Sequence, residues 1–230
     1  MYTVSMAYPA KTDRATILAV AIKQLVTYGL AGLSIRSVAA ELSLAPNALY
    51  RYFRDRSQLE SAMADEIAGR LHAVLRNAAQ RTRGKTKDDP AATLRIIARA
   101  YLRFARVQHS LYDMMMSTRV DPEDDGAGHA GLWLFTFEHV APLAGDVYAP
   151  EAAVSLWAFL HGIAVLSAGG ALGGKKPESS IEYGLNAWIA GVAKAAQEAS
   201  GQRKVNFTET KRQARSGKLP ISPAPQPCHT

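Results

Sequence analysis

The sequence of 230 residues has a single cysteine, Cys228, which cannot form an internal disulfide or a cysteine-based metal site. It has no run of about 18 apolar residues free of charged residues or a glycine break. Residues 1–10 lack the basic start and apolar core of a secretory signal. We therefore expect no membrane span, no membrane partner and a cytoplasmic protein.

Residue patterns typical of catalysis are missing as well. The six histidines are scattered, and no Ser-His-Asp or Cys-His set, zinc-ligand spacing or glycine-rich phosphate loop is apparent. We expect no enzyme activity, no metal and no cofactor. An enzyme built on a helical shell stays an alternative, which turnover without any DNA binding would support.

Strand patterns are absent too, because no segment alternates apolar and polar residues with a period of two. Apolar residues recur instead at helical spacing, first over residues 17–28, with a stop at Tyr28-Gly29. Asp55 and Gln58 occupy capping-box positions for a long helix that ends near Arg81. The sequence thus predicts an all-α fold. Further helices are expected over residues 91–108, 132–140, 150–169 and 177–199, after a linker at 84–90 and a loop at 121–131.

The most informative stretch, residues 33–53, has the pattern of two short helices joined by a tight turn. Ile35, Val38 and Leu42 fall on one helical face, and Ser34 is placed to cap the first helix. The second helix is expected from Ala45 to Tyr52, because proline at position 46 is tolerated where a helix begins.

The outer side of this second helix is polar and carries Asn47, Tyr50, Arg51 and Tyr52, while Arg36 belongs to the first helix. An amide, phenols and guanidinium groups on a short helix suit the DNA major groove. An ordinary helical hairpin with a solvated polar side would show the same pattern.

Charge is divided unevenly along the chain. Residues 1–87 carry 13 Lys and Arg against 6 Asp and Glu (+7), residues 88–200 carry 8 against 13 (−5), and residues 201–230 carry 6 against 1 (+5). A polyanionic partner is therefore expected at the N-terminal part. The last segment is basic and contains prolines, so we expect residues 201–230 to be a disordered tail.

Residues 14–71 resemble the DNA-binding domain of the TetR family of transcriptional repressors. The resemblance is carried by Leu49-Tyr50-Arg51-Tyr52-Phe53, followed by basic Arg54 and by Leu59. It implies a helix-turn-helix domain that binds a double-stranded DNA operator as a homodimer.

For the DNA contacts, Asn47, Tyr50 and Arg51 are expected at base edges or nearby sugar-phosphate, next to Ala45 and Pro46 at the helix start. Ser34, Arg36, Tyr52 and Arg56 are expected at phosphates. Lys11 and Arg14 of the N-terminal arm are candidates for a minor groove or phosphate contact.

A second resemblance covers residues 95–195. Trp157, His161 and Gly162 are similar to the Trp-His-Gly signature of one class of TetR C-terminal domain, and residues 111–115 resemble the segment before it. This implies a dimer in which the last two helices form a four-helix bundle with their copies. The expected dimerisation residues are Gly162, Ile181, Leu185, Trp188, Ile189 and Val192.

The same class implies an apolar ligand pocket, for which family analogy and residue type suggest a set of side chains. The set is Phe104, Met114, Met115, Met116, Trp133, Phe137, Trp157 and His161. Helical cores contain the same residues, and His161 suits a hydrogen-bonded core position as well. The arginine stripe at 95, 99, 103 and 106 likewise suits either a solvated face or an acidic partner.

The predicted organisation is a helix-turn-helix domain at 1–54 with an arm at 1–11, a helical regulatory and dimerisation domain at 55–200, and the tail at 201–230. The predicted function is a homodimeric repressor released from a near-palindromic operator by a small-molecule inducer. A ligand-independent DNA-organising or cell-cycle factor on the same scaffold is the alternative.

Overall fold

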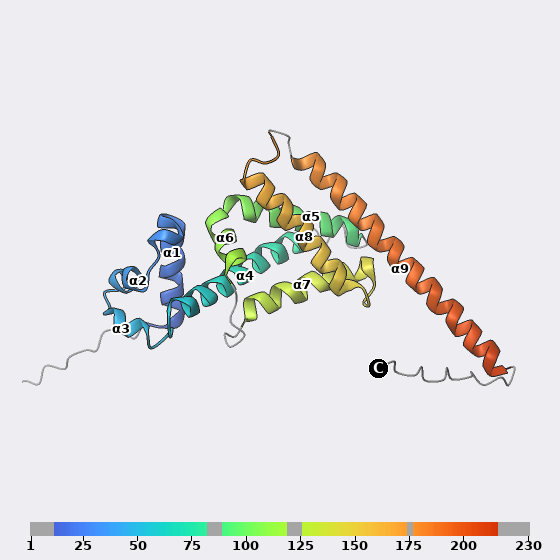
Figure 1. Cartoon of the computed structure of the whole chain (residues 1–230), viewed down its shortest axis with the longest axis horizontal. Helices are drawn as coiled ribbons and strands as arrows, with labels where there is room; N and C mark the ends of the chain where they lie inside the picture. The colour runs from blue at the N-terminus through green and yellow to red at the C-terminus, as the bar shows by residue number, and fades with distance from the viewer. Residues whose placement is uncertain (1–11, 82–88, 119–125, 174–176, 216–230) are drawn as a thin grey trace, which may run out of the picture.

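The computed structural model describes residues 12–81, 89–118, 126–173 and 177–215. Over these ranges the protein is helical and contains no strand, so the predicted all-α fold is confirmed. Figure 1 shows an N-terminal group of short helices at one end, a larger helical body, and a last helix that extends past the body. The helices are α1 (Arg14–Gly32), α2 (Ile35–Glu41), α3 (Pro46–Leu49), α4 (Arg56–Gln80), α5 (Pro90–Val107), α6 (His109–Ser117), α7 (Ala127–Ala144), α8 (Ala149–Ala168) and α9 (Pro177–Arg215).

Local sequence signals set the boundaries in the N-terminal domain, which comprises α1–α3. The predicted stop at Tyr28-Gly29 is confirmed as a break in α1, because Gly29 has φ 69° and ψ 179°. Ser34 caps α2 as predicted, and its hydroxyl accepts a hydrogen bond from the Ser37 N–H at 2.9 Å. Ser43 then turns the chain toward α3 with φ 56°, a left-handed conformation that is uncommon outside glycine.

Helix α3 is shorter than predicted. It spans Pro46–Leu49, and the residues up to Tyr52 form turns instead of continuing the helix. The N–H groups of Tyr52 and Phe53 both donate to the Leu49 carbonyl, and the Tyr52 hydroxyl donates to the carbonyl of Thr12, ahead of α1. The burial of Phe53 and the hydrogen bond from Tyr52 to Thr12 hold these residues in a turn outside the helix.

Helix α4 joins the N-terminal domain to the body. The Asp55 carboxylate caps it through the Gln58 N–H at 2.8 Å, as predicted, while the Gln58 side chain accepts from the N–H of Arg54, one residue earlier than the capping box requires. The helix ends at Gln80, with Arg81 as its C-cap. It packs against α1 as well as α5, α6 and α7, so it belongs to both domains.

The body is formed by α4–α9. Helix α5 begins at Pro90 with Asp89 as its cap, and residues 84–88 of the predicted linker lie outside the described residues. Helix α7 begins at Ala127, five residues before the predicted start, because the Asp65 carboxylate of α4 accepts hydrogen bonds from the N–H groups of Gly128 and His129. The cap of α7 therefore comes from another helix.

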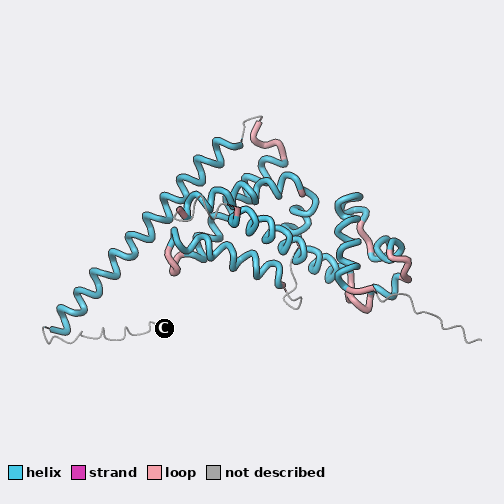
Figure 2. Tube along the Cα trace, turned by 180° about the vertical axis from the view of Figure 1, so that it is seen from behind, coloured by secondary structure: helices cyan, strands magenta, loops and turns pink. Residues whose placement is uncertain are grey.

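Helix α9 continues to Arg215, so the prediction of disorder is wrong for residues 201–215. This stretch has no proline and contains good helix formers such as Gln, Lys, Arg, Ala and Glu, whereas the four prolines of the tail come after Leu219. Residues 216–230 lie outside the described residues. Seen from behind in Figure 2, the second half of α9 runs clear of the other helices.

Two helices, α1 and α8, have the length and apolar composition of a membrane span, although α1 contains Lys23 and α8 contains Gly162. Buried core helices share these properties. In α1 the apolar side chains of Ile17, Ala21 and Leu25 are buried inside the N-terminal domain.

Candidate functional site

Helices α2 and α3 lie at the outer end of the molecule (Figure 1). Exposed polar side chains gather on these two helices and on the turn that follows α3. Arg36, Asn47, Tyr50 and Arg51 are all exposed. In the described part of the chain, the side chains of Arg36, Asn47 and Arg51 make no hydrogen bond or ion pair. Two cations and an amide are thus available to an external partner.

The other predicted DNA contacts have partners within the chain. The Ser34 hydroxyl caps α2, and the Tyr52 hydroxyl binds the Thr12 carbonyl. The Arg56 Nε lies 2.7 Å from a carboxylate oxygen of Glu60. Arg14 lies over the Phe53 ring, 4.6 Å from its centroid, and donates to the Tyr52 carbonyl. Lys11 lies outside the described residues.

A polar cluster between α1 and α2, which the sequence analysis missed, fixes the position of α2. The buried Gln24 side chain donates to the Ser37 carbonyl at 3.0 Å and to the Glu41 carboxylate at 2.8 Å. Hydrogen bonds from Lys23 and then Gln24 lower the pKa of Glu41. The signal in the sequence was a polar residue between Ala21 and Leu25 on the inward side of α1.

The body contains a cavity of about 300 Å³ between α4, α5, α6, α7 and α8. Its wall is mainly aromatic and aliphatic. The lining residues are Leu75, Leu94, Ile97, Tyr101, Met115, Met116, Thr118, His129, Leu132, Trp133, Phe135, Thr136, His139, Leu156, Trp157 and Leu160.

The structure brings Met115, Met116, Trp133 and Trp157 from the predicted ligand set to this wall. The others lie behind it. Phe137 stacks on Trp133 with 5.6 Å between ring centroids, and Phe104 and Met114 are buried in the core.

His161 belongs to a chain of hydrogen bonds behind the wall. Its Nδ1 lies 2.7 Å from the Tyr112 hydroxyl, which lies 2.8 Å from the Tyr101 hydroxyl. Burial raises the pKa of both tyrosines, so both hydroxyls stay protonated at neutral pH. These contacts match the hydrogen-bonded core position, which is one of the two alternatives that the sequence allows for His161.

His129 is a lining residue that the sequence analysis missed, and it connects the cavity to α4. Its Nδ1 lies 3.0 Å from the Asp65 carboxylate, which also accepts the two N–H groups at the start of α7. Burial opposes ionisation of Asp65, but these hydrogen bonds outweigh it and lower its pKa. Helices α4 and α7 come so close here that a side chain at Gly128 would overlap the Asp65 carbonyl oxygen.

The predicted dimerisation residues fall into two groups. Leu185 and Ile189 are buried in the core of their own chain, and Ile181, Trp188 and Val192 pack against it. Gly162 of α8 has open space beside it.

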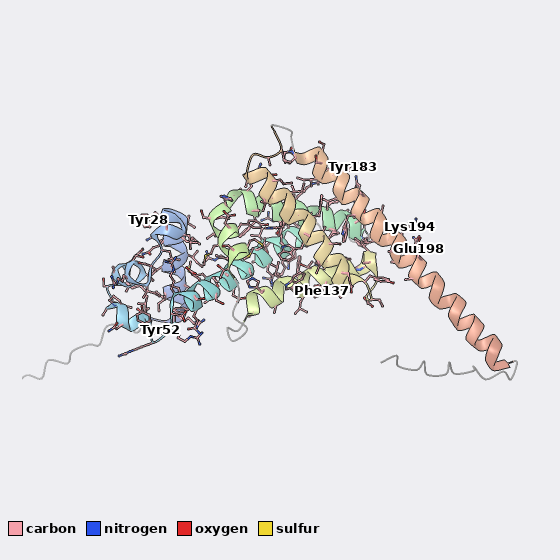
Figure 3. All side chains as sticks on the ribbon, in the orientation of Figure 1. Tyr28, Tyr52, Phe137, Tyr183, Lys194 and Glu198 are labelled. Atoms are coloured by element: carbon pink, nitrogen blue, oxygen red, sulfur yellow. The ribbon has the colours of Figure 1, made fainter. Side chains whose placement is uncertain are left out.

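A different set of apolar residues is exposed on α8 and on the outer side of α9. They are Val154, Trp157, Val165, Leu166 and Tyr183. Figure 3 shows Tyr183 on α9, with Lys194 and Glu198 farther along the same helix. The exposed residues between Tyr183 and Lys194 include Ala187, Ala190 and Gly191, which leave room for another helix.

Half of the arginine stripe on α5 is engaged with α9. Arg95 donates to the Asn186 side chain at 2.8 Å, and Arg99 pairs with Glu182. Arg103 and Arg106 border a pocket with Ile163 and Glu178. Arg95 and Arg99 therefore help to hold α9 on the body.

The geometry defines a class of protein: a helix-turn-helix domain joined by one long helix to a hollow helical body. The comparisons with known proteins agree. The family profile "Bacterial regulatory proteins, tetR family" matches residues 17–63, and the profile "Tetracyclin repressor-like, C-terminal domain" matches residues 94–188. The chain belongs to the TetR family of DNA-binding transcriptional regulators.

Solved structures share this fold. A protein of unknown function from Rhodococcus sp. RHA1 is 30% identical, with 82% of this chain and 99% of that chain covered and a TM-score of 0.63. A BioQ protein with its natural double-stranded DNA operator is 21% identical, with 80% and 99% covered and a TM-score of 0.56. A TetR variant from Acinetobacter baumannii AYE in complex with minocycline is 21% identical, with 80% and 98% covered and a TM-score of 0.56.

Proposed function

We propose that the protein is a homodimeric transcriptional repressor that a small molecule releases from a near-palindromic operator. The observation that carries the proposal is the cavity, because it lies against α4, the helix that leads directly to the N-terminal domain. A molecule that fits better in one position of α4 than in another shifts the protein between two states. We expect this to take place in the cytoplasm.

In each subunit α3 would enter the major groove. Asn47, Tyr50 and Arg51 are the proposed contacts to base edges or adjacent sugar-phosphate, and the exposed Ala45 and Pro46 start the helix. Arg36 is the strongest candidate for a phosphate, because it is exposed and unpaired among the described residues. Ser34, Tyr52 and Arg56 would add phosphate contacts through groups already held in place. BioQ, which shares the fold, has been solved with its natural double-stranded DNA operator, and this supports operator binding by the present protein.

Two subunits would meet through α8 and α9. The exposed Val154, Val165 and Tyr183, with the small residues Gly162 and Ala187, offer apolar surface on both helices for a second copy. Of the residues predicted from sequence, Gly162 lies on this surface, whereas Leu185 and Ile189 support it from the core beneath. The dimer must hold the two α3 helices roughly 34 Å apart to reach both half-sites.

Operator selection tests the proposal. Duplexes retained by the purified protein at low salt are selected from genomic fragments, and sedimentation gives the mass of the free protein. We expect a near-palindromic duplex and a dimer. Failure to retain any duplex, or sedimentation as single chains only, would contradict the proposal.

The variant Val165→Glu should dissociate the dimer, because a charge would be buried in the apolar surface. It should lose operator binding with it. Ser110→Glu, which places the same charge on an exposed residue of α6, is the control and should remain a dimer.

The cavity also separates this proposal from a ligand-independent DNA-organising factor on the same scaffold. A filled core would have favoured that alternative. Trp133→Ala should abolish the response to an inducer and leave the fold and operator affinity intact, and an unchanged response would exclude Trp133 from the ligand site.

A further inference from the structure

We propose that the cavity takes an apolar molecule with a ring system and one hydrogen-bonding group, and that His129, held by Asp65, reports its presence to α4. This inference rests on the proposed function and assigns the ligand class and the residues that transmit binding. Three groups of observations support it: the wall of the cavity, the two ring nitrogens of His129, and the contact between α4 and α7.

The wall selects for ring systems. Trp133, Trp157 and Phe135 contribute flat aromatic surfaces, and Trp133 meets Trp157 edge to face at 5.7 Å between centroids. The described lining residues include no Asp, Glu, Lys or Arg. A charged ligand would lose its hydration there without an ionic partner on this wall. An uncharged molecule with ring faces gains most from the site.

The hydrogen-bonding groups of the wall differ in what they already bind. The Tyr101 hydroxyl is engaged by Tyr112, and the Thr136 hydroxyl donates to the Leu132 carbonyl. His129 uses Nδ1 for Asp65, which leaves Nε2 without a partner among the described residues. The Nδ1 of His139 binds the Phe135 carbonyl, so its Nε2 is equally without a partner among the described residues, but only His129 joins its ring to another helix. A polar group on the ligand that bonds to Nε2 of His129 would therefore act on a ring that Nδ1 connects to α4.

Asp65 of α4 connects His129 in the cavity wall to α4 through hydrogen bonds. Its two carboxylate oxygens hold the Gly128 N–H at 3.0 Å, the His129 N–H at 2.9 Å and the His129 ring at 3.0 Å. The backbones also touch at this point, where a Cβ on Gly128 would lie 2.0 Å from the Asp65 carbonyl oxygen. Because the two backbones are closely packed at this point, a shift of His129 must move α4 or break these hydrogen bonds.

His139 provides a matched control. It lies on the same helix and lines the same cavity, but its Nδ1 binds the Phe135 carbonyl of its own helix at 2.9 Å. Replacing either histidine by phenylalanine changes the wall in the same way. Only His129→Phe removes a side-chain link to α4, and it keeps the two backbone hydrogen bonds to Asp65, so the start of α7 stays capped.

The experiment uses the full chain, the selected operator duplex and three fluorescent probes: uncharged Nile red, anionic anilinonaphthalene sulfonate and cationic ethidium. We expect Nile red to bind at least tenfold more tightly than the charged probes and to lose this binding in Trp133→Ala. Equal or tighter binding of a charged probe would overturn the ligand class.

Coupling is measured as the ratio of operator affinities without and with saturating Nile red, so that differences in probe affinity cancel. We expect at least a fivefold loss of operator affinity in the wild type and in His139→Phe, and less than twofold in His129→Phe. A fivefold loss in His129→Phe, or loss of coupling in both variants, would overturn the role of His129 alone. If Nile red binds but leaves the operator affinity of the wild type unchanged, the inference fails while the proposed function stands. Failure to retain any DNA contradicts the proposed function itself.

Discussion

The two domains are packed in opposite ways. In the N-terminal domain Leu49 and Phe53 have no exposed surface, and their side chains fill the space between α1, α2 and α3. The body surrounds a cavity of about 300 Å³ with large side chains such as Trp133 and Trp157. A filled core fixes the geometry of a surface that must match DNA, whereas a hollow core leaves helices with more than one favourable arrangement.

The largest expected effect tests the filled domain. Phe53→Ala removes a fully buried ring and the surface under Arg14, and should destabilise the N-terminal domain by about 3–5 kcal/mol. Chemical denaturation followed by circular dichroism measures the loss. Operator binding should disappear with it.

The matching variant in the body is Trp133→Ala, whose loss of stability is compared with that of Phe53→Ala. Trp133 already borders empty space, so fewer contacts are lost and the cost should be at least about 1 kcal/mol smaller than for Phe53→Ala. Equal costs would show that the cavity wall is packed as tightly as the N-terminal core.

A smaller effect is expected where the two regions meet. Asp65→Ala leaves the first N–H groups of α7 without their carboxylate and should cost about 2 kcal/mol at neutral pH. In the folded state, hydrogen bonds lower the pKa of Asp65 below its ordinary value of 3.8, so the carboxylate contributes stability above that pH and loses this contribution as the pH falls further.

Thermal unfolding between pH 7 and pH 2 measures this contribution. The wild type should lose its advantage over Asp65→Ala as the pH falls below 3.8. Asp146→Ala, at an exposed carboxylate after α7, is the control and should follow the wild type throughout. A constant difference between wild type and Asp65→Ala down to pH 2 would contradict the assignment.

Caps made within a few residues were predictable from sequence, and caps made across the fold were not. Ser34, Asp55 and Asp89 each bind an N–H group three residues ahead, so spacing alone reveals them. The start of α7 depends on Asp65, some 60 residues earlier, and the end of α3 depends on contacts of Tyr52 with Thr12. A sequence pattern within one segment cannot reveal a partner that lies far away in the sequence.

The same distinction holds for the candidate sites. The polar surface of α3 and the turn after it was visible in the sequence because Asn47, Tyr50 and Arg51 lie within five consecutive residues. In the cavity, residue type was enough to suggest Met115, Trp133 and Trp157, but not His129, whose position depends on where α7 crosses α4. Nor could residue type separate Leu185 in the core from Tyr183 on the surface, since both lie on an apolar part of α9.

The smallest expected effect concerns the outer surface, where Arg36 and Arg56 were predicted alike as phosphate contacts. The structure leaves Arg36 without a partner among the described residues but pairs Arg56 with Glu60 at 2.7 Å. Each cation that neutralises a phosphate adds about 0.9 to the slope of log affinity against log salt concentration. Arg36→Ala should therefore reduce the slope by about 1 per subunit, and Arg56→Ala by less, because Glu60 already offsets part of its charge. Operator titrations across a range of salt concentrations measure both slopes.

Glu60→Gln in the wild-type background tests whether Arg56 contacts a phosphate. It should strengthen operator binding if Arg56 does so, because it frees the guanidinium group. An unchanged salt-dependence slope would remove Arg56 from the interface.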